Sequence, residues 1–169
     1  MTKTVEWRNR SEIMSSEDHQ ATPTHCAIPA ALEAVGERWS FLILRGAFNG
    51  LRHFEEFQST LGIARNILSN RLARLVEHEI LSREPDPADR RRVAYRLTEK
   101  GRELLPVLLA LRQWGDRWIC KTPSNPVLID RASGQPVAPI CVRAADGRPL
   151  ALHELDWVDR STLGDDQAR

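Results

Sequence analysis

The spacing of apolar residues in segment 61–80, LGIARNILSNRLARLVEHEI, predicts an amphipathic helix. Leu68, Leu72, Leu75 and Val76 recur at intervals of three, four and seven residues, which places them on one face of an α-helix. We expect this face to be buried in a hydrophobic core. The elements on either side are interpreted by their relation to this helix.

The opposite face of the same helix is polar and cationic. Its residues are Asn66, Ser69, Asn70, Ala73 and Arg74, with Arg65 at the front of the helix and Arg71 on its flank. Amide groups can pair with adenine, guanidinium groups with guanine, and hydroxyl or amide groups with phosphate oxygens. An ordinary solvated helix is the alternative interpretation, although the alternating Glu and Lys residues typical of one are missing. The face is therefore a candidate DNA-reading surface.

Three shorter helices are predicted before this segment. Pro29 suits the first turn of a helix that stops at Gly36, and the apolar pattern after Gly36 predicts a second helix that ends at the Asn49-Gly50 turn. A third helix is expected from His53 to Thr60, and Leu61-Gly62 then forms a short joint. Two helices joined so closely, the second with a polar face, are typical of a helix-turn-helix.

The pattern changes to a period of two after this helix pair. Val93 and Tyr95 alternate with polar neighbours, so residues 81–97 predict a β-hairpin. Three adjacent arginines stand at its tip: Arg90, Arg91 and Arg92. Such a tip can reach a minor groove or flanking phosphates, which would make the hairpin a wing. The alternative is a solvated turn whose charge is neutralised locally by Asp86 and Asp89.

A long helix is expected from Glu99 to Cys120, capped by Thr98 and kinked near Pro106. Its apolar stripe is wider than one small core requires. The stripe comprises Leu104, Leu108, Leu111, Gly115 and Trp118, broadened by Leu105, Val107, Leu109 and Trp114. We expect the excess apolar surface to contact a second copy of the chain, because a dimer would set two recognition helices one DNA turn apart.

Both ends of the chain differ from this central part. Residues 1–25 lack a sustained apolar period and are expected to form a flexible arm. Residues 121–169 combine five prolines with short apolar runs, and Asp146-Gly147 predicts a hairpin turn, so a small β-rich appendage is expected. Cys120, Cys141 and His153 match no zinc-ligand spacing, and no metal or cofactor is expected.

Composition narrows the class of protein. The formal net charge is only +1, but arginines crowd the middle of the chain, so a local basic surface is compatible with it. The three cysteines have no CxxC spacing, and neither a secretory signal nor a membrane-spanning run is visible, so a cytoplasmic location is expected. No catalytic motif is present, so we expect no enzyme activity.

Six short motifs occur in a fixed order between Cys26 and Trp118. They are Cys26 with Pro29, Gly36-Glu37-Arg38-Trp39, Phe54-Glu55-Glu56-Phe57, Leu68-Ser69-Asn70-Arg71-Leu72, Tyr95-Arg96-Leu97-Thr98-Glu99-Lys100-Gly101 and Trp114-Gly115. Their order and spacing resemble those of the HxlR family of bacterial winged helix-turn-helix transcription regulators. The resemblance implies a homodimer that binds operator DNA through the helix beginning near Ala64 and through the wing.

The chain departs from the family pattern at three places. Ala64 stands where the family commonly has Ser or a similar helix cap, and His53 replaces the basic residue before Phe54. The wing tip, residues 86–92, is more similar to that of the related MarR regulators. Some HxlR-type regulators sense electrophiles or oxidants through a cysteine at the position of Cys26. The resemblance therefore makes Cys26 a redox-sensing candidate, since the N-terminal end of a helix favours a thiolate.

The sequence thus predicts a mainly α protein of the α+β type. Residues 26–120 would form a winged helix-turn-helix with a long dimerisation helix, followed by the β-rich appendage. The expected function is a homodimeric transcription regulator, a repressor or dual regulator, which binds double-stranded operator DNA and responds to an oxidant or another small-molecule effector. The alternative is a winged-helix module that binds another protein instead of DNA.

Overall fold

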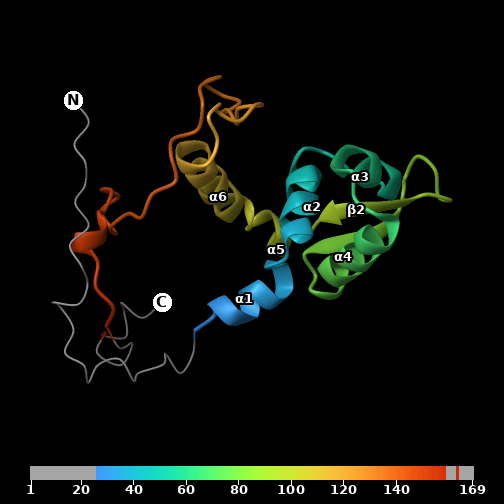
Figure 1. Ribbon diagram of the computed structural model, residues 1–169, viewed down its shortest axis with the longest axis horizontal. Helices are drawn as coiled ribbons and strands as arrows, with labels where there is room; N and C mark the ends of the chain where they lie inside the picture. Colours follow the sequence, from blue (N-terminus) through green and yellow to red (C-terminus); the bar gives the residue numbers. More distant parts are fainter. Residues whose placement is uncertain (1–25, 159–162, 164–169) are drawn as a thin grey trace.

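The computed structural model describes residues 26–158 and residue 163, so the predicted arm at residues 1–25 lies outside the described residues. The elements follow one another along the chain as α1 (Ile28–Val35), α2 (Arg38–Phe48), α3 (Phe54–Leu61), α4 (Arg65–Glu77), β1 (Leu81–Pro85), β2 (Val93–Leu97), α5 (Glu99–Arg102), α6 (Leu105–Trp118) and η3 (Leu152–Glu154). The predicted mainly α fold with a small antiparallel β element is confirmed (Figure 1).

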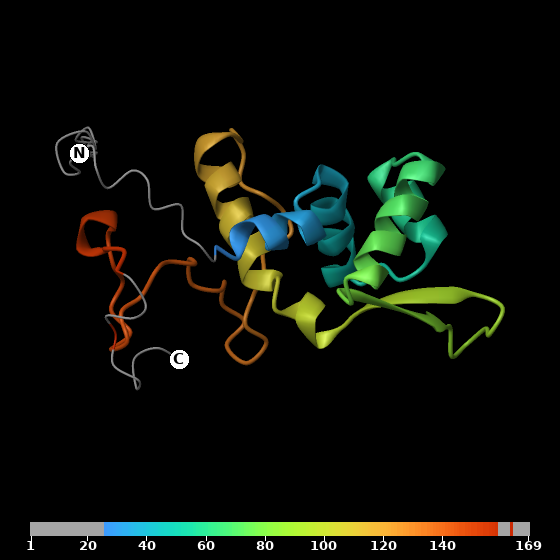
Figure 2. The same ribbon diagram turned by 90° about the horizontal axis from the view of Figure 1, so that it is seen from below.

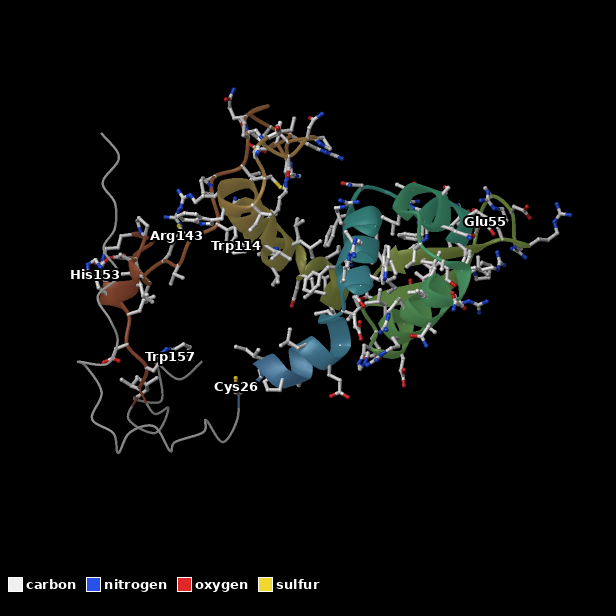
Figure 3. The ribbon with its side chains drawn as sticks, viewed as in Figure 1. Cys26, Glu55, Trp114, Arg143, His153 and Trp157 are labelled. Atoms are coloured by element: carbon white, nitrogen blue, oxygen red, sulfur yellow. The ribbon has the colours of Figure 1, made fainter. Side chains whose placement is uncertain are left out.

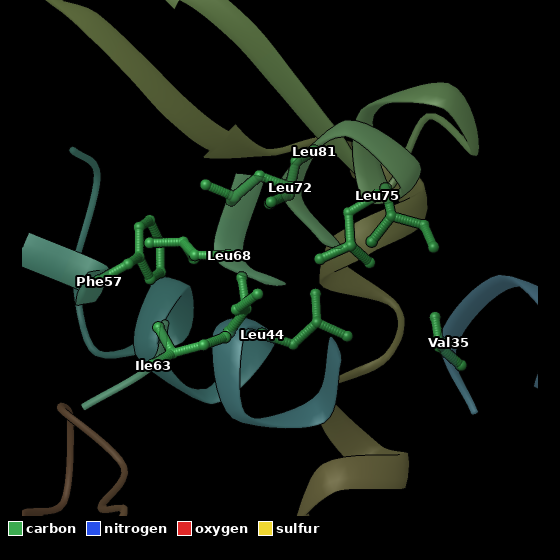
Figure 4. Close-up of a cluster of buried hydrophobic side chains, with 10 residues drawn as sticks. Val35, Leu44, Phe57, Ile63, Leu68, Leu72, Leu75 and Leu81 are labelled. Carbon is green, nitrogen blue, oxygen red and sulfur yellow. The ribbon is translucent and has the colours of Figure 1, made fainter. Parts of the chain in front are cut away.

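The hydrophobic core lies between α2, α3, α4 and the base of the hairpin (Figure 4). Leu68, Leu72 and Leu75 of α4 are fully buried, which confirms the apolar face predicted for this helix. Val76 is only partly buried at its edge. Phe57 from α3 and Leu44 from α2 complete the centre of the core. The buried face of α4 thereby fixes which of its residues reach the surface.

The turn between α3 and α4 is short because one glycine adopts a left-handed conformation. Gly62 has φ of +60°, and its N–H donates to the Gln58 carbonyl at 3.1 Å, which ends α3. Ala64 is the N-cap of α4 and offers no side-chain cap, as expected from the sequence. The two helices therefore meet in the predicted helix-turn-helix arrangement.

The hairpin is an antiparallel pair in which Leu81 faces Leu97 and Pro85 faces Val93. It is tied back to the start of α3. The Tyr95 N–H donates to the Arg52 carbonyl at 2.7 Å, and Ala94 forms an isolated bridge with His53. The second strand of the wing is consequently held by the helical body, whereas the wing tip extends beyond the helices (Figure 2).

The prediction of one helix from Glu99 to Cys120, kinked near Pro106, is wrong. The segment is divided into α5 and α6. Pro106 lies in the first turn of α6, and a proline clashes with the carbonyl four residues before it, which is that of Arg102, the last residue of α5. The proline therefore breaks the helix instead of bending it. The predicted cap is confirmed, because the Thr98 hydroxyl accepts the Gly101 N–H at 3.0 Å.

The appendage consists of turns with little regular structure. Within residues 121–158, isolated β-bridges join Ile129 to Pro136 and Arg143 to Pro149, and η3 follows them. Gly147 has φ of +87° in the turn predicted at this position. No helix in the described part of the chain is long and apolar enough to cross a membrane. The described residues also contain no cluster of three or more His, Cys, Asp or Glu side chains suited to a metal ion.

Candidate nucleic-acid interface

The exposed face of α4 carries polar side chains that were predicted from the sequence to form a candidate DNA-reading surface. Arg65, Asn66, Ser69 and Asn70 are all exposed, because the leucines between them point into the core. Ile67 is also exposed on this helix, beside Asn66 and Asn70. Sequence reasoning missed it as a surface residue. An apolar side chain among amides can contact the methyl group of thymine.

Arg65 is held in place at the front of the helix. Its guanidinium carbon lies 4.9 Å from the centre of the Phe54 ring, a cation–π contact with the first residue of α3. This contact limits the rotamers of an otherwise exposed arginine. Arg65 is therefore held at the junction of the two helices.

The other two arginines of α4 are turned toward the helical body. Arg71 forms an ion pair with Glu37 at 3.4 Å, and its side chain is only 19% exposed. Arg74 donates to the backbone carbonyl of Glu33 at 3.1 Å. These contacts join α4 to the ends of α1 and α2. They place Arg71 and Arg74 on the flank of the candidate surface, apart from the four side chains at its centre.

The wing tip presents its three arginines to solvent, with one of them paired. Arg91 contacts Asp89 at 3.3 Å. In the described part of the chain, Arg90 and Arg92 form no ion pair, since the other nearby carboxylate, Asp86, is turned toward His53. Local neutralisation of the tip, the alternative considered from the sequence, is thus confined to Arg91.

His53 joins the start of α3 to the wing. Its Nε2 lies 2.5 Å from an Asp86 carboxylate oxygen, and its Nδ1 lies 2.9 Å from Glu56. Glu56 also accepts the backbone N–H groups of His53 and Arg52. Hydrogen bonds to Glu56 and Asp86 raise the pKa of His53 above its ordinary value, opposed by partial burial and by the charge of Arg92. We call these three side chains the His53 clamp.

The same contacts favour the charged form of both carboxylates in the clamp. The pKa of Glu56 falls to about 2, chiefly because its carboxylate accepts the Arg52 N–H and then the His53 ring N–H. The pKa of Asp86 is also lowered, first by the Ala88 N–H and then by His53. The contacts of His53 with Glu56 and Asp86 thereby tie the start of the wing tip to the first turn of α3.

A groove of about 460 Å³ separates α4 from the wing. It is lined by Ser69, Ala73, Val76, Glu77, Arg83 and Tyr95. Arg83 was not among the site residues predicted from the sequence. The signal that could have found it is strand alternation, because Arg83 lies on the same face of β1 as the buried Leu81 and therefore faces α4. Glu77 also lines the groove, and its carboxylate opposes the approach of phosphate there.

Cys26 is exposed one residue before the N-cap of α1. In Figure 3 it lies toward the end of the molecule opposite Glu55 of α3. Cys120 and Cys141 are also exposed, and all three thiols are free. The Cys26 thiol is therefore accessible to a small oxidant.

A short-turn helix pair, a polar exposed face on the second helix and an arginine-tipped hairpin beside it define a winged helix-turn-helix of the transcription-regulator class. The chain belongs to the HxlR-like helix-turn-helix family, whose family model matches residues 34–123. The predicted family is thereby confirmed.

Several relatives support this assignment. The uncharacterized HTH-type transcriptional regulator Rv3095 of Mycobacterium tuberculosis is 40% identical over 127 residues, which span 75% of this chain and 76% of the relative. The HTH-type transcriptional regulator YodB of Bacillus subtilis is 33% identical over 90 residues, spanning 53% of this chain and 80% of YodB. The crystal structure of PA1607, a candidate transcription factor, is 44% identical with a TM-score of 0.73, covering 82% of this chain and 97% of PA1607.

Proposed function

We propose that this regulator, a repressor or dual regulator, binds double-stranded operator DNA as a homodimer, with α4 in the major groove and the wing on the adjacent groove or backbone. The observation that carries the proposal is the exposed cluster of Arg65, Asn66, Ser69 and Asn70 on α4, together with the exposed arginines at the tip of the adjacent hairpin. Amide side chains at successive turns of one helix suit base edges, and the flanking guanidinium groups suit phosphates.

Within this proposal the polar residues of α4 have different roles. Asn66 and Asn70 read base edges, while Ser69 and Arg65 contact the groove wall and the backbone. Arg74 contacts the groove and Arg71 anchors a phosphate once they exchange their contacts with the Glu33 carbonyl and the Glu37 carboxylate for DNA. Arg90, Arg91 and Arg92 supply the contacts of the wing.

The proposed dimer uses the outward face of α6. Val107, Leu111, Trp114 and Trp118 are between 48% and 68% exposed and follow one another at helical spacing. We call these four residues the α6 stripe. A contiguous apolar surface of this kind is typical of a protein interface, and a second copy of the chain would pair the two stripes around a twofold axis. Ile28 and Leu32 of α1 would extend the contact.

Asn70→Ala tests the proposed reading face. Loss of one bidentate base contact should weaken binding to the operator by about tenfold, which corresponds to roughly 1.4 kcal/mol, and should leave folding intact because Asn70 is exposed. Fluorescence anisotropy with a labelled fragment of the regulator's own upstream DNA would measure the change. Lys100→Ala, an exposed cation on α5, is the control and should have no effect. Equal affinities of Asn70→Ala and Lys100→Ala for this DNA would contradict the proposed reading role of the exposed α4 face.

A redox response through Cys26 is a second proposed property. The supporting observations are the accessibility of the thiol and the similarity to YodB, whose structure described as its reduced form is 32% identical with a TM-score of 0.50 and covers 56% of this chain and 95% of YodB. Diamide treatment should abolish DNA binding of the wild type and spare Cys26→Ser. Equal loss of binding in both proteins would exclude Cys26 as the sensor.

A further inference from the structure

We propose that the C-terminal appendage, residues 121–158, packs on the partner protomer of the dimer. This inference rests on the proposed homodimer. Its first support is the lack of a core within the appendage: none of its described residues is buried. The six most exposed of its large apolar residues are Val127, Ile129, Val142, Leu152, Trp157 and Val158, and Trp157 is 92% exposed. A segment with this much bare apolar surface is expected to meet another surface.

The beginning of the appendage is fixed to α6. Arg112 donates to the carbonyl oxygens of Ser124 and Pro126 at 2.9 and 2.5 Å, and Asp116 accepts both the N–H and the hydroxyl of Ser124. The Ile140 N–H donates to the Gln113 side chain at 3.0 Å. These bonds set the direction in which the appendage leaves α6.

The anchoring residues and the α6 stripe lie on opposite faces of the helix. At 3.6 residues per turn, Arg112, Gln113 and Asp116 project from one side, and the four residues of the stripe project from the other. The chain's own appendage is thus attached behind the stripe and leaves it bare. One protomer therefore presents two apolar surfaces, the stripe and the appendage, that do not cover each other.

A second copy of the chain can cover both apolar surfaces, the α6 stripe and the appendage. If the two stripes pair with their helices antiparallel around a twofold axis, the start of each α6 lies beside the last turn of the partner's α6, and the appendage follows that turn. Figure 3 shows Trp157 and Trp114 at the same end of the molecule, opposite Glu55 of α3. Each appendage would then extend along its partner, add apolar area to the interface and leave both DNA-reading faces free.

A photo-cross-linking residue, p-benzoylphenylalanine, in place of Trp157 tests this arrangement in the full-length protein. The probe chain is co-expressed with a probe-free chain that carries a larger affinity tag, and the mixed dimer is purified and irradiated. We expect a product with the summed mass of the two chains, with cross-linked peptides from the probe-free chain. The same probe in place of Ala88, at the exposed wing tip, is the control and should give no such product.

The other outcomes would overturn the inference. Cross-links confined to peptides of the probe chain itself would place the appendage on its own protomer, and a dimer without any protein cross-link would mean that the appendage packs on nothing. Sedimentation before irradiation separates these results from failure of the homodimer, because a monomeric chain would overturn the proposed dimer as well.

Dimer dissociation gives a second readout that does not depend on the probe. Removing a large buried aromatic from an interface commonly costs a factor of ten or more in affinity. We expect Trp157→Ala to raise the dimer dissociation constant by about tenfold and Arg131→Ala, a change at an exposed polar position of the appendage, to leave it unchanged. Equal dissociation constants would contradict packing of Trp157 against the partner.

Discussion

At the scale of single residues, the motif side chains of this regulator mainly build the scaffold that presents other residues. Glu37 pairs with Arg71, Phe54 stacks on Arg65, and Thr98 caps α5. Asn66 and Asn70 face solvent between these fixed points. If Asn66 and Asn70 read bases as proposed, operator preference can change at these two residues without loss of the fold.

The His53 clamp should make the stability of the protein depend on pH. The folded-state pKa of His53 is raised above 6.5, so its stabilising contribution is fully present below pH 6.5 and is lost as pH rises through the folded value. The contributions of Glu56 and Asp86 have the opposite sign. They are present above the ordinary values of 4.5 and 3.8 and are lost as pH falls through the lowered folded values.

The clamp is therefore strongest between about pH 4.5 and 6.5. We expect the melting temperature of the wild type to exceed that of His53→Gln most in this window, and the difference to shrink as pH rises toward about 8.5. Thermal unfolding of both proteins across this range would measure it. A difference that stays constant with pH would mean that His53 stabilises the wing only as a neutral side chain.

Gly101 is required where α5 packs against the end of the α4–β1 connection. A Cβ at this position would lie 2.1 Å from the backbone oxygen of Ile80, which cannot move without disturbing the start of β1. We expect Gly101→Ala to lower the free energy of unfolding by about 2 kcal/mol, in the range of overpacked cores. Chemical denaturation against Lys100→Ala, an exposed neighbour, provides the test. A loss no larger than that of the control would disprove the close approach.

At the scale of elements, apolar periodicity predicted α1 to α4 and the hairpin because each depends on contacts within a few turns of chain. Contacts between residues far apart in the sequence could not be predicted from this periodicity. His53 and Asp86 are 33 residues apart, and Arg74 meets the Glu33 carbonyl 41 residues away, so both contacts exist only after the helices dock. The orientation of Arg71 and Arg74 toward the body could not be read from the face of an isolated helix. The break at Pro106 was foreseen only as a kink.

The orientation of α4 can be tested through its buried face. Leu72 is fully buried, so Leu72→Ala should lower the free energy of unfolding by roughly 2 to 5 kcal/mol through lost apolar contact and a residual cavity. Asn70→Ala, two positions away on the exposed face, should change it by less than about 0.5 kcal/mol. Similar losses for the two variants, measured by urea denaturation, would mean that the helix is rotated from the orientation described.

At the scale of the whole molecule, the proposed recognition face and the exposed apolar surfaces lie at opposite ends. Figure 1 shows α3, α4 and the wing at one end, and α1, α6 and the appendage at the other. A dimer formed at the apolar end leaves both DNA-reading faces uncovered. The exposed Cys26 lies at the same apolar end, so oxidation there would act on DNA binding through the arrangement of the two protomers.

The affinity of the full-length protein for its own upstream DNA across a salt series tests the central claim most directly. Phosphate contacts release counterions, so we expect log affinity to fall steeply and linearly with log salt concentration, and Arg90→Ala to reduce the slope by about one. Binding confined to protein partners, or DNA affinity that does not change with salt, would contradict the account and favour a winged-helix module that recognises protein.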